Sequence, residues 1–101
     1  MAILAIFYGK GIDKTMYDAL RKEVNWEKQL ATGGVFHAAG FDDHGDVHIS
    51  DVWRSAEEMN EFVGSRLAPA LQKLKIPMPE AKIFPTHNIN MHPNADQYRL
   101  G

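Results

Sequence analysis

The chain contains no cysteine, which excludes disulfides, thiolate metal sites and a cysteine nucleophile. It also has no excess of basic residues, because 11 lysines and arginines stand against 13 aspartates and glutamates and the formal net charge is −2. Nucleic acids and anionic membranes are bound through basic patches, so we expect neither partner. No apolar run approaches the ~20 residues that a membrane-spanning helix requires.

The apolar content is sufficient for one folded domain. The chain has 101 residues, of which 45% are hydrophobic and 10% aromatic, and this length is close to the commonest domain size. The apolar stretch at residues 1–8 lacks a basic region and a small-residue cleavage site, so we expect no signal peptide and a cytoplasmic location. We place the domain at residues 1–90 and a polar tail at 91–101, which we expect to be ordered only where a partner holds it.

Short runs of β-branched and aromatic residues predict four strands. The turn-rich cluster Asp42–Asp46 lies between the second and the third, and it predicts that these two strands form an antiparallel hairpin. Pro85 lies in the fourth strand and favours an edge position or a bulge. The predicted strands are 3–8, 35–41, 47–53 and 81–89.

Two segments with apolar residues at helical spacing predict helices. The first covers 14–24 and has Asp13 as its N-cap. The second begins at a capping box, Ser55 with Glu58, and continues to about residue 74. Pro69 lies inside it and predicts a kink or a break, because proline cannot donate a hydrogen bond to the carbonyl of Ser65.

The order β-α-β-β-α-β is typical of the ferredoxin-like, split βαβ arrangement. This is an α+β fold in which two helices cover one face of a four-stranded antiparallel sheet, with the strand order 4-1-3-2. The second face is uncovered, and both faces of the first strand are apolar. An uncovered apolar face of this size is an association surface, so we predict a homodimer that forms through the sheet.

The hairpin brings together the two residues that we single out for catalysis. If the turn spans Asp42–Asp46, His37 lies directly opposite Asp51. A carboxylate beside an imidazole fixes one tautomer and raises the basicity of the ring, which suits a general base. A register shift of one residue would place Ser50 there instead. A buried histidine with a purely structural partner is the alternative interpretation.

Five parts of the chain carry a resemblance to known proteins, and they are Gly34–Gly40, Asp51–Ser55, Phe62, Leu67–Leu71 and Phe84–Asn88. They resemble small proteins of the dimeric α+β barrel superfamily, near the antibiotic-biosynthesis-monooxygenase-like proteins. The resemblance extends over residues 2–89 and implies two ferredoxin-like subunits joined sheet to sheet. Members of this superfamily include cofactor-independent monooxygenases of polyphenolic substrates, haem-degrading enzymes, lactone isomerases and sensing domains.

The resemblance also implies that a flat substrate binds between the helices and the sheet. Trp53 and Asn88 would be hydrogen-bond donors to it. His87 and Asn88 end the predicted fourth strand and belong to the predicted substrate-binding set. His87 would lie too far from His37 to share its site unless the sheet curls strongly, and it would otherwise meet the partner subunit or form a hydrogen bond at the strand end. The asparagine–tryptophan–arginine set of active members has no residue-by-residue match in this chain. The predicted lining is Trp53, Phe36, Phe62, Tyr17 and Met59, with a plain hydrophobic core as the alternative.

The sequence is consistent with two functions. The first is an enzyme, monooxygenase-like or isomerase-like, that acts on a small aromatic or quinone-type molecule without a cofactor, with His37 as the base and Asp51 as its orienting partner. The second is a non-catalytic small-ligand-binding or assembly module of the same fold. We expect no metal site, because the histidines lack the close spacing of metal ligands.

Overall fold

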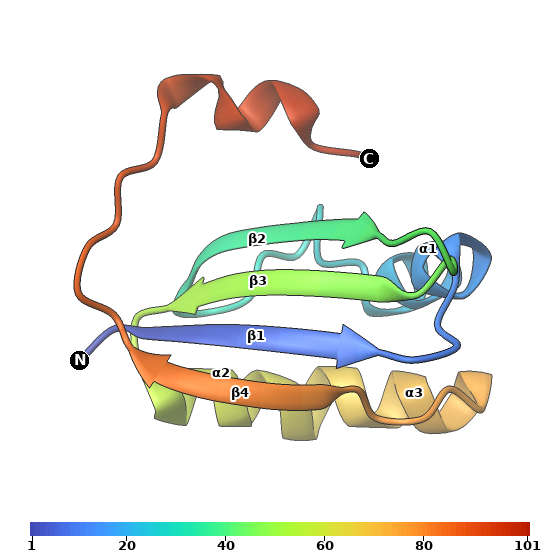
Figure 1. The fold of residues 1–101 in the computed structure, drawn as a ribbon. Helices are drawn as coiled ribbons and strands as arrows, with labels where there is room; N and C mark the ends of the chain where they lie inside the picture. The colour runs from blue at the N-terminus through green and yellow to red at the C-terminus, as the bar shows by residue number, and fades with distance from the viewer.

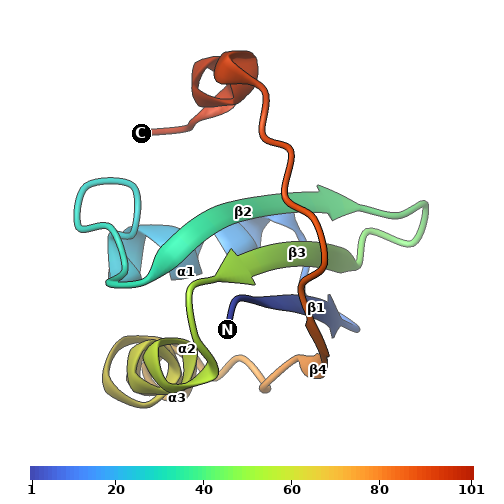
Figure 2. The same ribbon diagram turned by 90° about the vertical axis from the view of Figure 1, so that its left-hand side faces the viewer.

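The computed structural model describes all 101 residues and has one four-stranded antiparallel sheet, in the order β2-β3-β1-β4. The helices lie together on one face of this sheet (Figures 1 and 2). The ferredoxin-like α+β fold and its strand order are therefore confirmed. The elements are β1 (Ile3–Gly9), α1 (Lys14–Val24), β2 (Gly34–Phe41), β3 (Val47–Trp53), α2 (Ala56–Phe62), η1 (Val63–Leu67), α3 (Ala68–Leu74), β4 (Glu80–Pro85) and η2 (Pro93–Tyr98).

Strand β4 ends four residues earlier than the sequence pattern predicts. It pairs only with β1, and the pairing runs out where Pro85 faces Ile3. The amide of Thr86 still donates to the carbonyl of Ala2, over 2.9 Å. Beyond Ala2 there is no neighbouring strand to bond, so the alternating residues that follow cannot continue the ladder.

The second helical segment is interrupted just before Pro69, as predicted. Residues Val63–Leu67 form a π-helical turn, and the amide of Ala68 donates to the carbonyl of Val63, five residues back. Proline removes one donor and its ring crowds the carbonyl of Ser65, and the wider π turn accommodates both effects. None of the helices combines the length and the apolar character that crossing a membrane requires.

The core between the helices and the sheet consists of two clusters. One joins α1 and α3 to the Val47 end of β3, and Val47 is 1% exposed. The other lies under α2 and contains Trp53 and Met59 with the buried side chains of β1. The helix face of the sheet is therefore filled along its length.

The uncovered face of the sheet has an apolar end and a polar end. The strand register aligns Phe36, Val52, Leu4 and Phe84 in one row across all four strands. Of these, Phe84 is 47% and Phe36 is 37% exposed. A second row on the same face is polar and lies four residues further along β1 and β2. It contains Gly40, His48, Tyr8 and Glu80.

The tail leaves β4 and runs past the ends of the strands to the far side of β2 (Figures 1 and 2). It contains the short 3-10 helix η2, which His92 caps by accepting a hydrogen bond from the amide of Asn94. The last residue, Gly101, lies beside Glu27. The apolar side chains of Met91, Tyr98 and Leu100 are all exposed.

Candidate functional site

The turn between β2 and β3 sets the register that assembles the site. The amide of Asp42 donates to the carbonyl of Asp46, and the amide of Gly45 donates to the carbonyl of Asp42. Gly45 has φ 84°, a left-handed conformation that glycine adopts without strain. His37 consequently faces Asp51 across the hairpin. The predicted register is correct, because the irregularity in β2 lies earlier, between Gly34 and Phe36.

Asp51 is the buried carboxylate at the centre of the site. Its Oδ1 is 2.6 Å from Nδ1 of His37, and its Oδ2 accepts a hydrogen bond from Nε1 of Trp53 over 3.3 Å. The side chain of Asp51 is 12% exposed, whereas that of His37 is 34% exposed. A buried carboxylate requires such donors, so we assign the tautomer of His37 that carries its proton on Nδ1.

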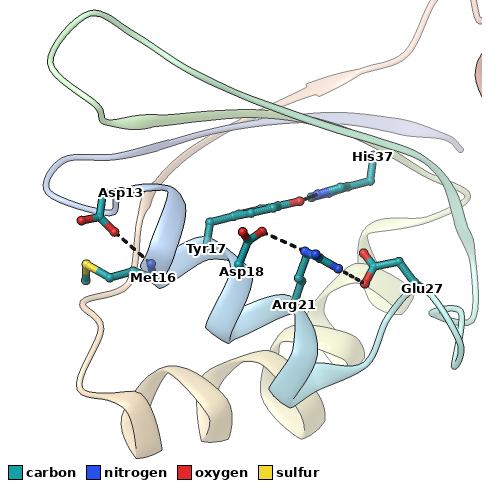
Figure 3. Close-up of polar contacts among 7 residues, drawn as sticks. All are labelled: Asp13, Met16, Tyr17, Asp18, Arg21, Glu27 and His37. Carbon is teal, nitrogen blue, oxygen red and sulfur yellow. Dashed lines mark hydrogen bonds and ion pairs between the residues drawn. The ribbon is translucent and has the colours of Figure 1, made fainter. Parts of the chain in front are cut away.

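Tyr17 forms a hydrogen bond with the second ring nitrogen of His37, Nε2. Asp13 caps α1 by accepting a hydrogen bond from the amide of Met16, and the helix then points Tyr17 at β2 (Figure 3). The hydroxyl of Tyr17 lies 2.8 Å from Nε2 of His37. Burial, followed by the negative charges of Glu27 and Asp51, raises the pKa of Tyr17 well above its ordinary value. The phenol therefore stays protonated and donates to Nε2.

Two further aromatic residues belong to this group, Trp26 beside His37 and Phe41 beside Tyr17, and the sequence analysis missed both. The ring of Trp26 lies 5.2 Å from that of His37 and 5.8 Å from that of Tyr17. Phe41 meets Tyr17 edge to face, with the centroids 5.8 Å apart. The alternation of β2 places Phe41 on the face of His37 and could have identified it. Trp26 lies in an irregular segment, where no periodicity predicts its direction.

The residues predicted to line a ligand site do not lie together around one cavity. Phe36 is on the uncovered face, because neighbouring residues of a strand point to opposite faces and His37 points to the helices. Met59 and Phe62 pack in the second core cluster, where the rings of Trp53 and Phe62 are 5.3 Å apart. Only Tyr17 and, through Asp51, Trp53 belong to the site around His37.

His87 and Asn88 lie outside this site. Both follow the end of β4 at Pro85 and are exposed, and neither has a side-chain hydrogen bond. The early end of β4 is the reason, because it releases both residues from the sheet. His48 and His44 also lie away from the site. His48, on β3, bonds Asp42 over 2.7 Å at the polar end of the sheet, and His44 lies in the turn between β2 and β3.

No three histidine, aspartate or glutamate side chains converge as a metal-ligating group. Two surface pockets of about 190 and 260 Å³ lie near Pro77–Pro79 and near Lys14, and neither includes His37 or Asp51. The chain Asp51–His37–Tyr17 can hold an imidazolium, stabilised by the carboxylate at one nitrogen and bonded to a phenol at the other.

No family model and no curated protein matches the sequence, but solved structures do. A protein of unknown function from Nitrosomonas europaea is 14% identical, with a TM-score of 0.66 over 91% of this chain and 96% of that one. SnoaB, a cofactor-independent oxygenase from Streptomyces nogalater, is 10% identical, with a TM-score of 0.63 over 87% and 94%. A candidate antibiotic biosynthesis monooxygenase from Chloroflexus aurantiacus is 17% identical, with a TM-score of 0.60 over 91% and 97%.

These likenesses extend over most of both chains, and they include candidate antibiotic biosynthesis monooxygenases and a cofactor-independent oxygenase. The resemblance that the sequence carries is thus confirmed at the level of the fold. Sequence identities of 10–17% show the fold alone, because one fold supports many unrelated activities.

Proposed function

We propose that this chain is the subunit of a homodimeric, cofactor-independent enzyme. It removes a proton from a small planar aromatic or quinone-type molecule, with His37 as the base. The observation that carries the proposal is the continuous hydrogen-bonded chain from the buried Asp51 through His37 to Tyr17. The carboxylate orients the ring and stabilises the imidazolium that forms.

The proton reaches His37 by way of Tyr17. The lone pair of Nε2 points at the Tyr17 hydroxyl, 2.8 Å away, and Tyr17 is packed in the core and 7% exposed, so a ligand cannot easily displace it. The hydroxyl passes its own proton to Nε2 while its oxygen takes the proton of the ligand. The result is a ligand anion, an unchanged tyrosine and an imidazolium beside Asp51.

An anion of a hydroquinone-type ligand can then transfer electrons to dioxygen without help from a bound cofactor. Overall, one hydroquinone and one dioxygen give one quinone and one hydrogen peroxide. The protein supplies the base and a dry aromatic surface, which Tyr17 and Trp26 provide beside the partly exposed His37, with Phe41 packed against Tyr17. SnoaB is a cofactor-independent oxygenase with this fold. This supports dioxygen chemistry without a cofactor, whereas the reaction proposed here releases both oxygen atoms as hydrogen peroxide.

The dimer is proposed to form through the uncovered face of the sheet. The row of Phe36, Val52, Leu4 and Phe84 is apolar across all four strands, and no element of the chain covers it (Figure 2). Burial of such a row removes apolar surface from water, at roughly 25 cal/mol for each Å². A second copy offers the same row and can bury it symmetrically.

A non-catalytic ligand-binding module is the second candidate. The observation that favours it is that Asp51, His37 and Tyr17 all satisfy one another within the chain. A network of this kind also serves to fix a hairpin against a helix. The two functions differ in what they predict for a bound ligand: turnover in one case and binding alone in the other.

The test uses 1,4-naphthohydroquinone in aerated buffer. We would measure dioxygen uptake and the formation of 1,4-naphthoquinone, and subtract the rate without protein. The native chain should accelerate the oxidation, and His37→Gln should lower the rate by about 10²–10⁴. The matched control is His44→Gln, at an exposed histidine of the turn, which should oxidise the probe like the native chain.

Equal rates for the native chain and His37→Gln would reject His37 as the base. If nothing is oxidised but 1,4-naphthoquinone still quenches the tryptophan fluorescence, the binding module is the correct function. If the probe neither reacts nor binds, both functions are wrong for this class of ligand.

A further inference from the structure

The segment Asn25–Gln29, between α1 and β2, carries Trp26 to the site. Asn25 ends α1 in the left-handed conformation, with φ 64°, and turns the chain so that Trp26 packs against His37 and Tyr17. The indole Nε1 is buried and has no hydrogen-bond partner. A buried donor without an acceptor destabilises the chain that contains it, so the position of Trp26 is not explained by the stability of the chain alone.

Arg66 bonds the last residue of α1, directly before this segment, and the last residue of the segment itself. Its Nη2 donates to the carbonyl of Val24 over 3.0 Å and to the carbonyl of Gln29 over 2.7 Å. The guanidinium also lies over the ring of Phe62, 5.1 Å from the centroid. A planar guanidinium suits such a bridge, because its donors are held in a fixed geometry. Arg66 belongs to η1, and so it is the π turn before Pro69 that directs it toward this segment.

Packing alone does not hold the segment in place. Two residues of the segment, Lys28 and Gln29, are exposed. Leu30, which directly follows the segment, is exposed to 67%. The second tether is Glu27, which accepts from Nη1 of Arg21 over 3.2 Å while Asp18 accepts from Nε over 2.9 Å (Figure 3). This tether fixes Glu27 to α1 but leaves the carbonyls at the ends of the segment to Arg66.

We infer that Arg66 is a positioning residue, which acts through the segment Asn25–Gln29 to hold Trp26 as the aromatic wall of the ligand site beside His37. The inference rests on the proposed function of that site. Trp26 offers its ring to a planar ligand. Without Arg66 the segment would move away from His37 and the wall would be lost.

The test is ¹⁹F NMR of the full chain labelled with 5-fluorotryptophan. The two tryptophans give two signals, and Trp26→Phe identifies that of Trp26. In the native chain this signal should shift when His37 gains a proton, because the rings are in contact, and the shift should vanish in His37→Gln. In Arg66→Met the signal should move toward that of a solvent-exposed indole and lose its dependence on His37, while the signal of Trp53 stays in place.

Arg54→Met is the matched control, because Arg54 pairs with Glu58 and does not contact the segment; it should keep the native Trp26 signal. Arg66→Lys retains the charge and the stem but cannot reproduce the planar bridge, so its Trp26 signal should shift and broaden. This variant also keeps the test valid if Arg66→Met fails to fold. A native Trp26 signal, with its response to His37, in Arg66→Lys or in a folded Arg66→Met would overturn the inference.

A binding measurement separates this inference from the proposed function. The dissociation constant of 1,4-naphthoquinone should rise by about two- to tenfold in Arg66→Met, the range expected for the loss of one aromatic contact. If the native chain does not bind the quinone, the proposed function fails, while the ¹⁹F signals still decide whether Arg66 holds Trp26. If the quinone binds equally to the native chain and to Arg66→Met, Trp26 is not part of the ligand site.

Discussion

His37 and Asp51 face each other across the β2–β3 hairpin, with 2.6 Å between Nδ1 of the imidazole and Oδ1 of the carboxylate. The pair is asymmetric, because the carboxylate is buried and the imidazole is partly open to solvent. The buried partner fixes the orientation of the open one. This relationship holds His37 in place while its ring stays partly open to solvent.

The tautomer of His37 should depend on Asp51. In the native chain the proton lies on Nδ1, and Asp51→Asn should shift the population toward the tautomer with the proton on Nε2, because the amide NH₂ of asparagine can donate to Nδ1. The nitrogen shifts of the imidazole in ¹⁵N NMR distinguish the two forms. The same variant should lose about 1–3 kcal/mol of stability, because it weakens bonds to a buried charged group. Unchanged ¹⁵N shifts would mean that Asp51 does not set the tautomer.

Stability at alkaline pH should depend on Tyr17. The pKa of Tyr17 is raised above the ordinary value of 10.0, mainly by burial, so the unfolded chain releases the phenol proton at a lower pH than the folded chain. The contribution of Tyr17 to stability is therefore complete below pH 10 and is lost as the pH rises through the folded value. Urea unfolding between pH 8 and 11 should show a decline that is smaller in Tyr17→Phe. The control is Tyr98→Phe, at a ring that is 78% exposed, and it should decline like the native chain. A decline in Tyr17→Phe as large as that of the native chain would contradict the prediction.

Two glycines with nearly the same backbone conformation should differ in how they tolerate alanine. Gly33 and Gly45 have φ 83° and 84°, and alanine in this region costs about 1–2 kcal/mol. A Cβ at Gly45 would meet nothing within 4 Å, whereas a Cβ at Gly33 would lie 2.5 Å from Cδ of Glu58, in the capping box of α2. Gly33→Ala should therefore lose about 1–3 kcal/mol more of folding stability than Gly45→Ala. Thermal unfolding of both variants measures the difference, and equal losses would show that Glu58 moves aside freely.

The dimer should depend on Phe84 and not on its neighbour Ile83. The two residues are adjacent on β4 and are exposed to 47% and 43%, but Phe84 points to the uncovered face and Ile83 to the helix face. Phe84→Ser should dissociate the dimer at micromolar concentration, while Ile83→Ser should leave it intact. Sedimentation velocity gives the mass of each variant. A monomeric native chain would reject the proposed interface.

Several parts of the structure could be predicted from the sequence because they depend on neighbours along the chain. The Asp42–Asp46 turn predicted that His37 lies opposite Asp51 unless the register shifts by one residue, and the structure has the unshifted register. The caps at Asp13 and Ser55 marked where two helices begin. The interruption before Pro69 follows from one missing amide hydrogen. Each of these rests on local backbone geometry.

The contacts that complete the site could not be predicted in the same way. The helical pattern of α1 shows that Tyr17 faces the core, but not that its hydroxyl reaches Nε2 of His37, 20 residues away. The direction of Trp26 depends on a segment without periodicity, and that segment depends on Arg66, which lies 42 residues beyond Val24. The early end of β4 depends on where β1 begins.

The sequence by itself determined the order of the elements and the turn that joins β2 to β3, because strand alternation and turn chemistry act over a few residues. Only the tertiary structure decided between the two registers of the hairpin, and it places His37 opposite Asp51. It also decided what surrounds that pair: Tyr17 and Trp26 contact His37, and Phe41 contacts Tyr17, because α1 and the following segment pack onto the face of the sheet that carries His37. Such packing depends on the shapes of surfaces that meet only after the chain has folded.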